Sequence, residues 1–101
     1  MDSNYDAVRH LLAAPGIAQR TDRYIRADDF DFAGLAHESK TMSGGEALLV
    51  RIAHGLWHAE HSAGLWEVVR RLDSAGFERV LEALRIARGD AWMRSEARLV
   101  A

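Results

Sequence analysis

Apolar residues recur along this chain at helical spacing, and no window alternates with the period of two that marks a β-strand. The most continuous apolar stretch covers residues 44–61 and predicts the longest helix, which the Ser-Ala-Gly sequence at 62–64 ends. A second clear helical pattern covers residues 74–88. The sequence therefore predicts an all-α fold, a compact bundle of about five to seven helices around the central helix.

Capping residues and helix breakers place the other boundaries. Pro15 and Gly16 end the first helix, while Asp73 at the start and Gly89 at the end bound the helix at 74–88. On that helix one apolar face is shared by Phe77, Val80, Leu81 and Leu84. Shorter helices are predicted at residues 4–14, 17–26, 31–38 and 65–72, and an amphipathic piece is predicted from residue 90 onward.

Length and composition suit one small domain spanning residues 1–101, because 101 residues with 49% hydrophobic content can bury one core. There is no cysteine, which excludes disulfides and thiolate zinc sites. No apolar run is long enough for a membrane span, and the first residues lack a basic and apolar leader pattern. We expect a cytoplasmic protein of bacterial type, since arginine supplies nearly all of the basic residues.

The charge balance argues against a dedicated nucleic-acid binder, because 13 basic and 15 acidic residues give a net charge of −2. A helix-turn-helix regulator remains an alternative. It would run through residues 65–88 and turn Arg79, Arg85 and Arg88 toward a phosphate backbone. Glutamates on the same segment interrupt that basic surface. We therefore expect neither a nucleic-acid partner nor a membrane partner.

Ser43-Gly44-Gly45-Glu46 resembles the signature motif of ABC-type ATPases, in which such a turn opens a helix and presents backbone N–H groups to a phosphate. That family also needs a glycine-rich phosphate loop with a lysine and an acidic strand, and this chain has neither. We interpret the four residues as a capping box. Ser43 and Glu46 then each accept a hydrogen bond from the other's backbone N–H, which adds roughly 1 kcal/mol.

The two consecutive glycines at the start of that helix need a physical reason, since each costs up to ~1 kcal/mol compared with alanine. Close approach of another helix to Gly44 and Gly45 is one explanation. An anion bound at the open N–H groups is the other. The sequence leaves both open.

His54, His58 and His61 are spaced four and three apart, so they form one stripe on the predicted helix. Two of them could share a metal ion if a third ligand came from another element. The obvious donors are Asp73, Asp90, His10 and His37. We interpret the stripe as exposed surface and predict no metal and no cofactor, while a metal-dependent enzyme fragment remains a further alternative.

Catalytic constellations are missing from the sequence. No serine lies in a Gly-x-Ser-x-Gly elbow, and Asp28, Asp29 and Asp31 suit a turn that caps the next helix. We therefore predict no catalytic residues and no small-molecule substrate.

Apolar surface at the C-terminal end of the chain exceeds what a small bundle obviously needs. Ile86 points away from the apolar face of its own helix, and Trp66, Trp92, Met93, Leu99 and Val100 add further apolar area. Either the piece from residue 90 folds back over Ile86, or this C-terminal surface meets a partner protein or a second copy of the chain. We predict a non-catalytic protein–protein interaction module, such as an accessory subunit, an adaptor, an inhibitor or a self-associating subunit.

Overall fold

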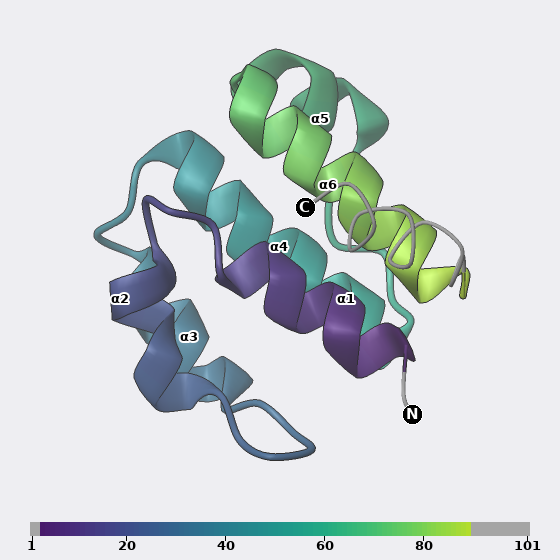
Figure 1. Cartoon of the computed structure of the whole chain (residues 1–101). Helices are drawn as coiled ribbons and strands as arrows, with labels where there is room; N and C mark the ends of the chain where they lie inside the picture. Colours follow the sequence, from purple (N-terminus) through teal and green to yellow (C-terminus); the bar gives the residue numbers. More distant parts are fainter. Residues whose placement is uncertain (1–2, 90–101) are drawn as a thin grey trace.

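Residues 3–89 are described by a computed structural model of the chain, and they are helical with short connections (Figure 1). The helices are α1 (Ser3–Leu12), α2 (Ala18–Thr21), the 3₁₀-helix η1 (Asp22–Tyr24), α3 (Phe32–Ser39), α4 (Gly44–His58), α5 (Leu65–Arg71) and α6 (Ser74–Ala87). Within residues 3–89 the β-type pairing is confined to an isolated bridge between Ile25 and Phe30. The predicted all-α fold is confirmed. No helix in this range is both long and apolar enough to cross a membrane.

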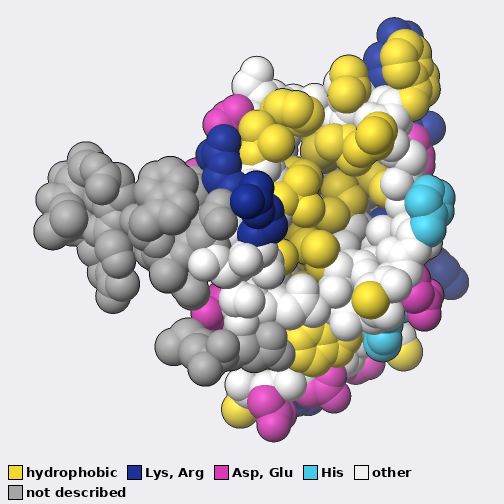
Figure 2. Space-filling view, turned by 90° about the vertical axis from the view of Figure 1, so that its right-hand side faces the viewer, with side chains coloured by type: hydrophobic (Ala, Val, Ile, Leu, Met, Phe, Trp, Pro, Cys, Tyr) yellow, Lys and Arg dark blue, Asp and Glu magenta, His cyan; other side chains and the backbone are white. Residues whose placement is uncertain are grey.

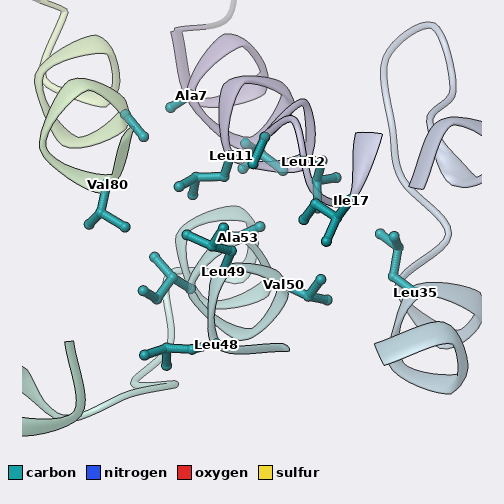
Figure 3. Close-up of a cluster of buried hydrophobic side chains, with 14 of the residues drawn as sticks. Ala7, Leu11, Leu12, Ile17, Leu35, Leu48, Leu49, Val50, Ala53 and Val80 are labelled. Carbon is teal, nitrogen blue, oxygen red and sulfur yellow. The ribbon is translucent and has the colours of Figure 1, made fainter. Parts of the chain in front are cut away.

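The core forms where α1 packs against both α4 and α6 (Figure 1). Figure 3 shows side chains of these three helices pointing toward one another, with Leu35 of α3 closing one side. The side chains of Leu11 and Leu48 are completely buried there. The other large side chains that are at most 1% exposed are Val8, Leu12, Ile17, Leu35 and Thr21. Helix α4 packs against α1, α3, α5 and α6 and is therefore the central helix that its apolar run predicts.

The start of α4 is the predicted capping box. The backbone N–H of Glu46 donates to Ser43 Oγ over 3.2 Å, and the N–H of Ser43 donates to Glu46 Oε1 over 3.1 Å. A Cβ atom on Gly45 would lie 3.0 Å from the carbonyl oxygen of Arg71, at the end of α5. Close approach of another helix therefore accounts for this glycine.

The end of α4 differs from the prediction, because the helix stops at His58 instead of reaching residue 61. Ala59 adopts a left-handed conformation with φ of 56°, and its N–H bonds back to the carbonyl of Gly55. The chain then folds so closely over Gly55 that a Cβ there would lie 2.7 Å from the Cβ of Ser62. This glycine lets the following loop pack on the helix, which ends it early.

Residues 17–26 do not form the single helix that the sequence predicts. Instead α2 is followed by η1, and the chain then makes the Ile25–Phe30 bridge. The hydroxyl of buried Thr21 explains this local geometry, because it donates to the carbonyl of Leu12 over 2.7 Å and ties α2 to the end of α1. Phe30 then packs in an aromatic cluster with its ring centroid 4.9 Å from that of Tyr5 and 5.0 Å from that of Trp57.

Candidate functional site

Large apolar side chains lie in solvent on the last two helices of the described chain. On α5, Leu65 is 85% exposed, Trp66 69% and Val69 61%, and on α6 Leu84 is 43% exposed. Figure 2 shows hydrophobic side chains gathered over the upper half of this side of the molecule. Together with half-buried Phe77 and Leu81 of α6, these residues form what we call the α5–α6 face.

Helix α5 presents Leu65, Trp66 and Val69 outward while polar contacts hold it to α4. Arg51 of α4 donates from Nη2 to Glu67 Oε2 over 2.8 Å, and the N–H of Gly64 donates to Glu67 Oε1 over 3.3 Å. The hydrogen bond from Arg51, followed by that from Gly64, lowers the pKa of the Glu67 carboxyl below its ordinary value. Val68 packs against the core, while no residue of α5 is fully buried.

Helix α6 divides its apolar residues between two surfaces. Val80 and Ala83 are buried and face the core, where α6 meets α1. Among residues 3–89, Phe77, Leu81 and Leu84 belong neither to the buried core cluster nor to the side chains that pack against it. These three side chains therefore form a separate apolar stripe beside the core.

The structure places only one of the predicted interaction residues. Ile86 is half-buried and packs against the core cluster, so only part of its side chain is available to a partner. Trp92, Met93, Leu99 and Val100 lie outside the described residues, and their role stays a prediction. The residues that sequence reasoning missed are Leu65 and Val69, which lie one helical turn apart. A spacing of four residues places both side chains on one face of a helix, and this was the signal that could have identified them.

Charged side chains surround the α5–α6 face. The guanidinium of Arg70 lies over the ring of Trp66, 4.8 Å from its centroid. On α6, Glu78 and Arg85 are both exposed. The face thus combines an apolar centre with a rim of both signs, which is the composition of many protein interfaces.

A cavity of about 750 Å³ opens between the start of α4 and the turn that joins α5 to α6. Its charged lining is mixed, with the guanidiniums of Arg71 and Arg79 and a larger number of carboxylates. Those carboxylates belong to Glu46, Asp73, Glu78 and Glu82. At the start of α4 the carboxylate of Glu46 already accepts from the N–H of Ser43. The excess of carboxylates around the cavity is a second reason why the site does not favour a bound anion.

The histidines share a stripe only in part. His54 and His58 are exposed, with ring centroids 4.6 Å apart, and both pack against the ring of Phe32. His61 follows the end of α4 and does not continue the stripe. Among residues 3–89 no group of three or more His, Cys, Asp or Glu side chains is placed to hold a metal ion. Edge-on and tilted contacts with the ring of Phe32 account for the two histidine rings that do meet.

Two of the candidate metal donors and one of the arginines that a DNA-binding reading would use have other contacts. His10 Nε2 lies 2.8 Å from a carboxylate oxygen of Glu82, and the Asp73 carboxylate accepts from the N–H of Gly76 at the start of α6. Arg79 donates over 2.7 Å to the carbonyl of His10 and so helps to hold α6 on α1.

Comparisons of the chain with protein-family models, with curated proteins and with solved structures give no significant match.

Proposed function

We propose that this protein is a non-catalytic, cytoplasmic protein–protein interaction module and that the α5–α6 face is its binding surface. The observation that carries the proposal is the exposure of Leu65, Trp66 and Val69 on one short helix. An exposed leucine alone needs no explanation, but three large exposed apolar side chains on one short helix, together with the apolar stripe of α6, exceed what scattered surface residues usually show.

The size of the patch supports the proposal. A whole aromatic side chain covers up to ~250 Å², so Trp66 alone leaves roughly 170 Å² of surface in water. The other members of the face bring the total to several hundred Å², the range in which patches on monomers are often functional. Tryptophan is also among the residues that contribute most to binding energy at interfaces.

Replacing Val69 by glutamate tests the surface without disturbing the core. Val69 is largely exposed, so Val69→Glu should fold normally and place a charge at the centre of the face. Gln19→Glu adds the same charge at an exposed position of α2, away from the face, and is the matched control. The wild-type protein, V69E and Q19E are each immobilised and exposed to extract of the native host, and their solution mass is measured by light scattering.

We expect V69E alone to lose the bound protein, whether that is a foreign partner or another copy of the chain. If V69E and Q19E retain the same proteins and have the same mass as the wild type, the proposed surface is wrong. Passage of the wild type through heparin at moderate salt is expected as well, because the net charge is negative and its arginines are scattered.

A further inference from the structure

The apolar stripe on α6 has the spacing of a coiled-coil seam. Phe77, Leu81 and Leu84 follow one another at intervals of four and three residues, and Ser74 and Arg88 extend the same spacing at each end. Such alternation places side chains along one line of a helix, where a second helix can pack between them. The seam lies beside the core instead of in it: Leu84 is 43% exposed and Phe77 and Leu81 are half-buried, so a second helix would complete their burial.

Charges flank this seam in a specific order. Glu78 directly follows Phe77, and Arg85 directly follows Leu84, so both occupy the same flank one heptad apart. Seven residues separate them by roughly 10 Å along the helix, too far for them to pair with each other. Both are exposed, and in residues 3–89 neither has an ion pair within 4.0 Å in the structure. The opposite flank carries Val80, which is buried in the core.

We propose that the occupant of the α5–α6 face is a second copy of this chain, with the two α6 helices packed antiparallel about a twofold axis. The inference rests on the proposed function and names its partner. In this register Leu81 of each copy lies opposite Leu84 of the other. Glu78 of each copy lies beside Arg85 of the other, and the twofold axis makes this pair twice.

The charges select this arrangement over the nearest alternatives. A shift of one heptad in the antiparallel pair brings Glu78 beside Glu78 of the other copy, which is repulsive. A parallel pair brings the flank of Glu78 and Arg85 against the flank of Val80, where the buried valine offers no charge to pair with them. In the antiparallel arrangement the rest of each molecule lies on the Val80 flank of its own α6, so both lie on the same side of the helix pair.

The area is consistent with a second copy. Stable interfaces bury about 800 Å² of each partner. The exposed apolar side chains of α5 and α6 account for several hundred Å² of this, so the polar rim has to supply the remainder and the α6 seam alone would fall short. The dimer therefore requires both helices of the α5–α6 face.

Charge reversal at Glu78 and Arg85 gives a test that identifies the partner. In E78R each copy presents two arginines along the flank, and in R85E each copy presents two glutamates. Each variant alone should dimerise about tenfold or more weakly than the wild type. An equimolar mixture of the two variants should dimerise as well as the wild type, and the double variant E78R/R85E should do the same.

Sedimentation equilibrium of the full chain from low to high micromolar concentration measures each dissociation constant. Glu60→Arg carries the same charge change as E78R on an exposed loop residue and should leave the dimer unchanged. A wild type that stays monomeric overturns the inference, because residues 90–101 or a foreign protein would then cover the face. Failure of the mixed variants to recover also overturns it. The proposed function survives either result if V69E still loses a partner that Q19E keeps.

Discussion

Gly44 and Gly45 offer a matched test of close packing, since the same substitution at adjacent positions should act on stability in different ways. Alanine in place of glycine in a helix is worth about 0.5–1 kcal/mol. A Cβ on Gly44 would meet only the guanidinium of Arg71, 3.3 Å away at the end of a long side chain that can move. Gly44→Ala should therefore stabilise the fold by up to about 1 kcal/mol.

At Gly45 the same methyl group meets backbone. Its Cβ would lie 3.0 Å from the Arg71 carbonyl oxygen, which is held in place because α5 leads directly into α6. Overpacking of this kind costs roughly 1–3 kcal/mol, more than the gain in helix propensity. We expect Gly45→Ala to unfold more easily than the wild type and to lie about 1–3 kcal/mol below Gly44→Ala.

Urea unfolding followed by circular dichroism measures the three free energies of unfolding. In a thermal scan each 1 kcal/mol should appear as a difference in Tm of about 4–8 °C. If Gly45→Ala is as stable as Gly44→Ala, the approach of α5 does not explain the second glycine.

Three further substitutions probe the fold. The hydrogen bond from Arg20 lowers the pKa of Glu38. The stability that this bond provides is therefore present above about pH 4.3 and is lost as the pH falls through the lower folded pKa. The difference in Tm between wild type and Glu38→Gln should shrink toward zero in that acid range. Thr21→Val leaves the carbonyl of Leu12 without its 2.7 Å donor and should cost about 1–2 kcal/mol in urea unfolding. Leu11→Ala empties a fully buried position and should cost about 2–5 kcal/mol, and a cost below 1 kcal/mol would contradict the described core.

Local signals in the sequence predict the starts of helices better than their ends. Ser43, Asp31 and Asp73 each accept from a backbone N–H three residues ahead, as their residue types and positions predict. The end of α4 depends instead on the loop that packs over Gly55, a contact between segments that periodicity does not reveal. Likewise the hydroxyl of Thr21 breaks the expected helix by reaching back to α1.

The candidate surface was predictable only in its general nature. Excess apolar area at the C-terminal end of the sequence indicated an interaction surface, but the apolar pattern could not show which residues the core would cover. Ile86 lies off the main apolar face of α6 yet packs on the core, whereas Leu84 lies on that face yet remains exposed. The difference arises because α1 covers one flank of α6 more fully than the other, which is a property of tertiary packing.

The polar attachment of α5 has a consequence for the dynamics of the surface it carries. A helix with no fully buried residue, held to α4 through Arg51 and Glu67, opens at a lower free energy than α1 or α4. The binding proposed for Trp66 and Val69 would require the closed form, so any open fraction would weaken the apparent affinity in proportion. Amide hydrogen exchange along α5 should therefore slow when a partner occupies the α5–α6 face, so the exchange rates of the α5 amides measure binding.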